Sequence, residues 1–280
     1  MKTRIIVDST ADMPPELKAR VHVVPLSVRF GDEEYVDGVT IDHHTFYEKL
    51  LSCPDLPTTS QATPEQFAAA YEAARAAGES AVVITLSSKL SGTYQSAVIA
   101  AQEFDNVRVV DSGTAAMGSG ILTELALSLV DGGADAATVA ATLEEAKRRI
   151  VIVALVDTLE YLKRGGRISK TTAFAGALLG IKPVLSVIDG EIAVLGKARG
   201  SKLGGNLLSE QITAVGGVDF SLPVLMGYSG LSDDLLRQYI EDSRPLWEGR
   251  LAAPRYTSVG SVIGTHAGPG AVVVAFFRNP

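Results

Sequence analysis

The chain has 280 residues, of which 46% are hydrophobic and 20% are charged, enough to bury one large core or two modest ones. Its net charge of −7 repels phosphate at long range, so we expect no nucleic-acid partner. One cysteine, Cys53, excludes an internal disulfide, and no N-terminal signal segment is seen, so we expect a cytoplasmic protein. The longest apolar stretch, residues 267–277, contains glycine and proline and is too short to span a bilayer, so we expect no membrane span.

The first half of the sequence alternates short β-branched runs with Ala-rich segments of helical period. This alternation is typical of α/β units around a mainly parallel sheet. We expect strands at residues 4–7, 21–30, 81–86, 107–110 and 150–156.

Two helices in this half carry signals at their ends. Thr63 can cap a helix that begins at Pro64, Gln66 completes a capping box, and Gly78 follows the last turn. The second helix begins after Asp135 and ends in the basic residues 147–149, so its terminal charges suit the helix dipole.

After about residue 157, longer strands flanked by turns replace this pattern. Asp189-Gly190 between two alternating runs predicts a β-hairpin, and further apolar runs occur at 222–230 and 270–277. We therefore predict two domains. Residues 1–157 form a three-layer α/β/α domain with a mainly parallel sheet, and residues 158–280 form a two-layer α/β domain with a mixed sheet and helices on one face.

Small polar residues follow several of the expected strands, where parallel α/β sheets bind their ligands. They either cap helices or form a site. Ser91 precedes a helix-like stretch, and Gly92 would allow a ligand to approach the backbone. With the hydroxyls at 58–60 and His266, this pattern favours a carboxylate-binding site.

Other chemistries have less support in the sequence. Neither GxxxxGK[ST] nor GxGxxG occurs, so nucleotide binding by this chain itself is poorly supported. A soluble serine acyl-ester hydrolase, with Ser91 as nucleophile and His266 as base, stays an alternative, although Lys89 stands where a GxSxG elbow needs glycine. His43 and His44 are adjacent and point in different directions, so we predict no metal site.

Seven segments in order carry a family resemblance: residues 7–12, 59–67, 87–97, 109–118, 159–169, 178–192 and 266–272. Over its whole length the chain resembles the DegV family of fatty-acid-binding proteins. The resemblance implies a two-domain α/β protein that encloses one long-chain, palmitate-like fatty acid and needs no cofactor. The carboxylate would lie near the cleft between the domains, and the acyl tail in an apolar tunnel of the C-terminal domain.

On the matching positions, the resemblance implies a carboxylate-binding set made of Thr59, Ser60, Ser91, Gly92 and His266. It also implies a carrier that is not itself an enzyme and serves as the acyl-carrying subunit of a bacterial fatty acid kinase. A separate subunit similar to dihydroxyacetone kinase would supply ATP and form the acyl phosphate.

Two arginines, Arg167 and Arg199, fall in segments that the family uses near the cleft. They could face the kinase partner or the transferred phosphate, or they could be solvated basic turns. Ala62 stands where proline is frequent in the family, which alters a loop but leaves both hydroxyls. Residues 172–188 are rich in small and aliphatic side chains, so they could line the tunnel or simply pack in the core.

Overall fold

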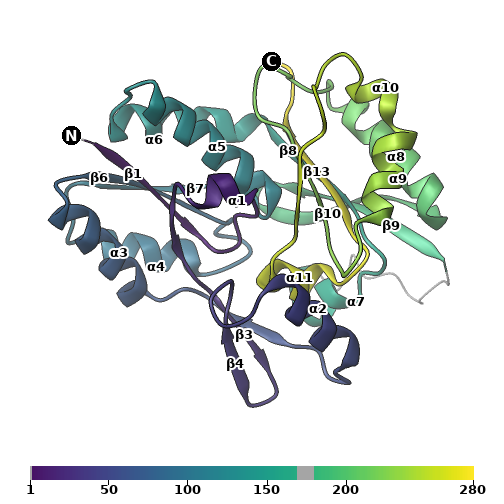
Figure 1. Cartoon of the computed structure of the whole chain (residues 1–280), viewed down its shortest axis with the longest axis horizontal. Helices are drawn as coiled ribbons and strands as arrows, with labels where there is room; N and C mark the ends of the chain where they lie inside the picture. Colours follow the sequence, from purple (N-terminus) through teal and green to yellow (C-terminus); the bar gives the residue numbers. More distant parts are fainter. Residues whose placement is uncertain (1, 169–179) are drawn as a thin grey trace.

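The computed structural model of the protein describes residues 2–168 and 180–280 (Figure 1). Among these residues the strands form three sheets. The first, the parallel sheet, pairs all its neighbours in parallel, as expected. Its order is β2 (His22–Val24), β1 (Thr3–Asp8), β6 (Ser80–Thr85) and β7 (Val107–Asp111).

Helices cover both faces of the parallel sheet, because successive strand residues point to opposite sides. Ile6 and Val83 pack under one pair of helices, and Ile5 and Val82 pack under the other pair. The first pair is α3 (Pro64–Ala76) and α4 (Thr93–Ala101), and the second is α5 (Met117–Asp131) and α6 (Ala136–Ala146). The predicted three-layer arrangement is therefore confirmed.

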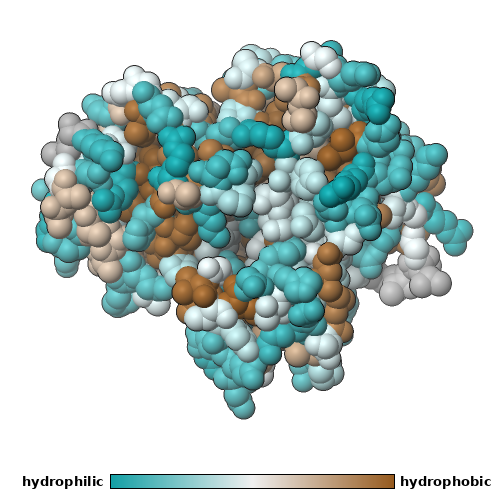
Figure 2. Space-filling view, in the orientation of Figure 1, coloured by the Kyte–Doolittle hydropathy of each residue, from teal (hydrophilic) through white to brown (hydrophobic). Residues whose placement is uncertain are grey.

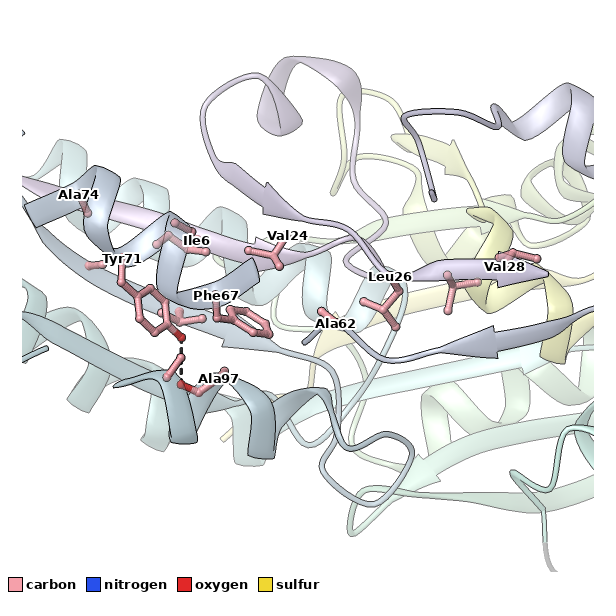
Figure 3. Packing of buried hydrophobic residues seen from close by; sticks show 14 of the residues in the cluster. Ile6, Val24, Leu26, Val28, Ala62, Phe67, Tyr71, Ala74 and Ala97 are labelled. Carbon is pink, nitrogen blue, oxygen red and sulfur yellow. Dashed lines mark hydrogen bonds between the residues drawn. The ribbon is translucent and has the colours of Figure 1, made fainter. Parts of the chain in front are cut away.

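Figure 3 shows how α3 meets α4 within the first of these cores. Tyr71 points from α3 toward α4, and its hydroxyl donates to the carbonyl of Ala97 over 3.1 Å. Ala62, which stands where proline was expected, is fully buried in the same cluster. Its methyl group therefore packs in the core beside the loop that carries the hydroxyls.

Both predicted helix ends are confirmed. The Thr63 hydroxyl accepts from the backbone of Gln66, and the Gln66 side chain accepts from the backbone of Thr63, which completes the capping box. Asp135 accepts from the Thr138 backbone N–H at the start of α6, and the basic residues at its end form the 3₁₀ turn η1 (Lys147–Arg149).

The second sheet, called the six-stranded sheet, is mixed, because β11 and β12 pair in parallel and the other neighbours are antiparallel. Asp189 and Gly190 join β9 to β10 with φ of 51° and 83°, so the predicted hairpin is confirmed. The strand order is β10 (Glu191–Arg199), β9 (Ile181–Ile188), β8 (Ile150–Leu155), β13 (Val272–Phe277), β11 (Leu225–Tyr228) and β12 (Tyr256–Ser258).

One face of the six-stranded sheet carries helices, as predicted. Val153 and Leu155 of β8 point into that core with Trp247. The helices are α8 (Gly200–Ala214), α9 (Asp234–Asp242) and α10 (Arg244–Trp247). The opposite face meets α5, whose Met117 and Ile121 pack against it while Leu122 packs on the parallel sheet. Helix α5 is therefore buried between the two sheets.

The single strand predicted at residues 21–30 is in fact two strands, β2 and β3, because the chain leaves the parallel sheet at Pro25. Proline has no N–H to donate to a strand ladder. Residues after it form a separate three-stranded sheet, in the order β4 (Glu33–Val36), β3 (Ser27–Phe30) and β5 (Thr58–Ser60). The tip of the β3–β4 hairpin, at the bottom of the view, is hydrophilic (Figure 2).

Strand β8, which we expected within residues 1–157, pairs with β9 and β13 of the six-stranded sheet. Its apolar run suits a buried strand of either sheet, so the pattern alone could not assign it. The division into domains at residue 157 stays a prediction.

Three short elements meet where the sheets come together, in the lower centre of Figure 1: α2 (His43–Ser52), α7 (Glu160–Arg164) and α11 (Ser261–Ala267). The remaining helix, α1 (Pro15–Lys18), follows β1. Within the described segments, no helix combines the length and apolar character needed to cross a bilayer.

Candidate functional site

A cavity of about 430 Å³ lies between the six-stranded sheet, α11 and the loops that follow the parallel strands. This volume falls in the usual range for small-molecule sites. Most of its wall is apolar. The strands contribute Ile152, Ala154, Leu185, Val187 and Val273, Val156 and Ala271 directly adjoin β8 and β13, and α11 and the loops contribute Val262, Ile263, Leu26, Leu86 and Leu90.

The structure brings six of the seven predicted site residues to this cavity: Thr59, Ser60, Ser91, Gly92, Arg167 and His266. The seventh, Arg199, is the exposed N-cap residue of α8 and does not line the cavity. The six residues come from four different parts of the fold, and together they form one polar region against the apolar wall, in which Thr59 and His266 are in direct contact.

Ser91 and Gly92 stand at the start of α4, so the predicted helix start is confirmed. Gly92 is the N-cap residue, and the Ser91 hydroxyl accepts from the Thr93 N–H over 3.3 Å and lies 2.9 Å from the Thr93 hydroxyl. The first turn of α4 thus directs free N–H groups and the positive end of its dipole toward the region of the hydroxyls.

Gln61 ties the β5 loop to α4, a role that we did not predict. Its amide donates to the Ser96 hydroxyl over 2.9 Å. A Cβ at position 92 would stand 2.1 Å from the Gln61 side-chain oxygen, so only glycine fits there without displacing Gln61. The Gln61 side chain therefore holds the loop of Thr59 and Ser60 against the start of α4.

His266 reaches the same region from α11, where its Nε2 lies 2.9 Å from the Thr59 hydroxyl oxygen. Residues 261–267 are helical, with His266 in the last turn, and this helix was not predicted from the sequence. Two acids far away in sequence begin this helix: Asp12 accepts from the Gly260 N–H, and Asp37 accepts from the Ser261 N–H and hydroxyl. No local signal in residues 255–265 could have revealed these caps.

Burial, and to a lesser extent the nearby Arg167, lower the pKa of His266 to about 4. The imidazole is therefore neutral at pH 7. Arg167 donates to the carbonyls of Leu90 (3.1 Å) and Gly165 (2.6 Å), and in the described part of the chain no carboxylate pairs with it. The polar region thus holds one guanidinium and no compensating carboxylate.

This arrangement suits a small anionic group attached to an apolar chain. Hydroxyls, a guanidinium and a helix N-terminus bind an anion, and the aliphatic wall provides a surface for alkyl groups. Of the tunnel segment predicted at 172–188, residues 172–179 lie outside the described residues, whereas Leu185, Ser186 and Val187 line the cavity. No group of three or more His, Cys, Asp or Glu side chains in the described ranges is placed to hold a metal ion.

A family model described as "Uncharacterised protein, DegV family" matches residues 2–279. The chain belongs to the DegV family. Its relatives include a DegV domain-containing protein of Caldanaerobacter subterraneus, 35% identical over 281 residues that cover 98% of each chain. The family resemblance inferred from the seven sequence segments is therefore confirmed.

Solved structures of DegV proteins have the same fold. A DegV family protein of Thermus thermophilus, described as binding a fatty acid, superposes with a TM-score of 0.88 at 35% identity, covering 99% of this chain and 100% of that one. DegV of Bacillus subtilis, described as a fatty acid binding protein, has a TM-score of 0.81 at 30% identity, with 99% and 100% coverage. The predicted fold class is thus confirmed over the whole chain.

Proposed function

We propose that this protein binds one long-chain fatty acid, with its carboxylate at Thr59, Ser60, Ser91 and Gly92 and its acyl chain along the apolar wall. The observation that carries the proposal is a single cavity that joins an anion-binding region to an aliphatic surface. DegV relatives of the same fold are described as fatty-acid-binding proteins, which supports this assignment.

The expected energetics favour a tail-driven association. Burying ~15 methylenes at ~0.8 kcal/mol each gives a gross gain of roughly 12 kcal/mol before the ordering costs of binding. Hydrogen bonds to the ionised head, at about 1.5–3 kcal/mol each, chiefly offset its desolvation. The head therefore selects a carboxylate, while the tail supplies most of the affinity.

Beyond binding, we propose that the protein is a carrier without turnover of its own, which presents the carboxylate to a separate kinase subunit in the cytoplasm. That subunit would resemble dihydroxyacetone kinase, supply ATP and form the acyl phosphate. Two features support an external partner: this chain has no phosphate-binding glycine motif, and the exposed Arg199 lies outside the cavity. Arg167, which lines the cavity, would face both the carboxylate and the incoming phosphate.

The ligand can be identified by mass spectrometry of protein that is purified natively from bacteria and then denatured. We expect release of one saturated or unsaturated long-chain fatty acid per chain. Protein that releases no fatty acid, and takes none up when palmitate is added, would contradict the proposed function.

Matched variants test the head-group site. Ser91→Ala should weaken fatty-acid binding by roughly 1–3 kcal/mol, about 5-fold to 150-fold, because a buried carboxylate loses one donor. Ser88→Ala, an exposed serine of the same loop outside the cavity, is the control. Arg199→Ala should slow phosphorylation by the partner without releasing the lipid; loss of lipid from this variant would reverse its assigned role.

The geometry does not favour the alternative of a serine hydrolase. The Ser91 hydroxyl pairs with Thr93, whereas His266 pairs with Thr59. His266 is also a weak base, because its pKa is lowered to about 4, and within residues 2–168 and 180–280 no acceptor meets its Nδ1 to orient the ring. Hydrolysis of p-nitrophenyl esters that Ser91→Ala abolishes would revive this alternative.

A further inference from the structure

The two ring nitrogens of His266 have different surroundings. Nε2 lies 2.9 Å from the Thr59 hydroxyl oxygen, whereas Nδ1 is buried and has no hydrogen-bond partner in the described part of the chain. Nδ1 instead faces Gly165, the C-cap residue of α7: a Cβ on this glycine would stand only 2.1 Å from Nδ1. A Cα hydrogen of Gly165 therefore points at Nδ1.

We propose that Gly165 holds His266 in the tautomer with its proton on Nε2, and that this makes the Thr59 hydroxyl a hydrogen-bond donor toward the bound carboxylate. The proposal rests on the proposed function, because it specifies how that site recognises an anion. Gly165 is a positioning residue: it acts through His266 and Thr59.

The first step concerns the cost of the alternative tautomer. A proton on Nδ1 would be a buried N–H donor without an acceptor, which costs free energy comparable to a lost hydrogen bond. A lone pair on Nδ1 faces a C–H group, a weakly favourable contact. The surroundings of Nδ1 therefore favour the tautomer with the proton on Nε2.

The second step follows the proton to the cavity. When Nε2–H donates to Thr59, the hydroxyl oxygen accepts from histidine, and its own proton is free to point to a ligand. In the other tautomer the hydroxyl donates to Nε2 and presents only lone pairs to the cavity, which repel a carboxylate. The position of one proton thus decides whether Thr59 attracts or repels an anion.

The third step is that the imidazole is neutral, so that a tautomer exists at all. Burial and Arg167 lower the pKa of His266 to about 4, which keeps the ring uncharged at neutral pH. A charged ring would need a partner at both nitrogens, and among the residues that the structure describes only Nε2 has one.

Two close contacts between a glycine and a ring join α7 and α11, and they keep Gly165 in place. Gly165 on α7 faces the ring of His266, and Gly268 at the end of α11 faces the ring of Tyr161, whose Cδ2 lies 2.3 Å from where a Cβ of Gly268 would stand. The Gly165 N–H also donates to the Tyr161 carbonyl over 2.9 Å. Each helix thus places a glycine against a ring of the other, and neither glycine can gain a side chain without displacing that ring.

Heteronuclear NMR of the histidine ring nitrogens tests the proposal on the full, unliganded chain at neutral pH. The sequence has four histidines, so His266 can be assigned by comparison with His266→Gln. We expect Nδ1 of His266 to show the shift of an unprotonated nitrogen and Nε2 that of a protonated one. A protonated Nδ1, or a mixture of tautomers, would overturn the proposal.

Binding measurements then connect the tautomer to the ligand. Gly165→Ala should displace the ring, mix the tautomers and weaken palmitate binding about 10-fold to 100-fold, the effect of one donor lost to a buried carboxylate. Lys163→Ala, on the exposed side of the same helix, is the control. Unchanged affinity in a folded Gly165→Ala protein with a displaced ring would count against the proposal.

A second pair of variants covers the case in which Gly165→Ala does not fold. Thr59→Val removes the hydroxyl and should weaken palmitate binding about as much, whereas Thr59→Ser should restore it. Equal affinities of these two variants would contradict a donor role for Thr59. If the wild-type chain binds no fatty acid, the proposed function fails, but the NMR result on the unliganded protein still decides the tautomer.

Discussion

The two large sheets differ in whether protein side chains fill the position at which each sheet could bind a ligand. In the parallel sheet, β1 lies between β2 on one side and β6 on the other, so the strand order reverses direction at β1. The crevice at such a switch point is where parallel α/β sheets usually bind a ligand. Here Asp8 fills it: one oxygen accepts from the Leu86 N–H over 2.7 Å, and the other accepts from the N–H and hydroxyl of Thr10.

The six-stranded sheet has the opposite arrangement. One face is covered by α8, α9 and α10, but part of the other face, at Ala154 of β8, lines the cavity. The parallel sheet thus contributes to the cavity through the loops beyond its strands, whereas the six-stranded sheet contributes one of its faces. The polar end of β1 serves internal hydrogen bonding at Asp8, and the proposed ligand contact comes from the loop that carries Ser91.

The largest effect should come from filling the cavity at that face of the six-stranded sheet. Ala154→Phe would occupy space that the acyl chain needs; excluding about four methylenes at ~0.8 kcal/mol each costs roughly 3 kcal/mol, about 100-fold in affinity. Calorimetric titration with palmitate measures this loss. Ala253→Phe, in an exposed loop, is the control, and an unchanged affinity of Ala154→Phe would show that the chain does not run along β8.

A change in the closed crevice should affect stability and spare binding. Asp8→Ala removes the acceptor of the Leu86 and Thr10 N–H groups and should lower the free energy of unfolding by about 2 kcal/mol. Because Asp8 does not line the cavity, palmitate affinity should stay the same. Urea denaturation and calorimetry separate the two effects; a loss of affinity as large as that of Ser91→Ala would mean that the crevice belongs to the ligand site.

The smallest effect concerns pH. Burial raises the pKa of Asp8 from 3.8 to about 6 and raises the pKa of Asp12 well above its usual value. Because its pKa is higher in the native state than in the unfolded state, the Asp8 carboxyl binds a proton more tightly when the protein is folded. The stability that this proton contributes is fully present below pH 3.8 and is lost as pH rises through about 6.

Between pH 4 and pH 7 we therefore expect the free energy of unfolding to fall by about 1–2 kcal/mol, and Asp8→Asn should reduce that slope. The carboxyls with lowered pKa, such as Asp135 and Asp219, titrate below pH 4. In that lower pH range they make the free energy of unfolding rise with pH. Unfolding curves at several pH values provide the measurement. A slope that Asp8→Asn leaves unchanged would assign the effect to Asp12 or to other groups.

Elements with local signals were predictable. The two residues of the capping box, Thr63 and Gln66, are three positions apart, and the Asp189-Gly190 turn joins adjacent strands, so each is decided by neighbours in sequence. The prediction of one strand at residues 21–30 was wrong because the run is apolar and β-branched on both sides of Pro25, so its composition does not show that the chain changes sheet there. Helix α11 around His266 was not predicted, because its caps, Asp12 and Asp37, lie more than 200 residues away.

By itself the sequence determined the alternation of helices and strands, the start of α4 at Ser91 and Gly92, and, through family resemblance, that all the predicted site residues except Arg199 lie together at one cavity. These features depend on neighbours a few residues apart or on matched segments. Only the tertiary structure decided that Asp8 closes the parallel-sheet crevice, that β8 joins the other sheet, and that His266 meets Thr59 across 207 residues. Such contacts arise when distant segments pack together and bury apolar surface, and residue spacing along the chain carries no record of that packing.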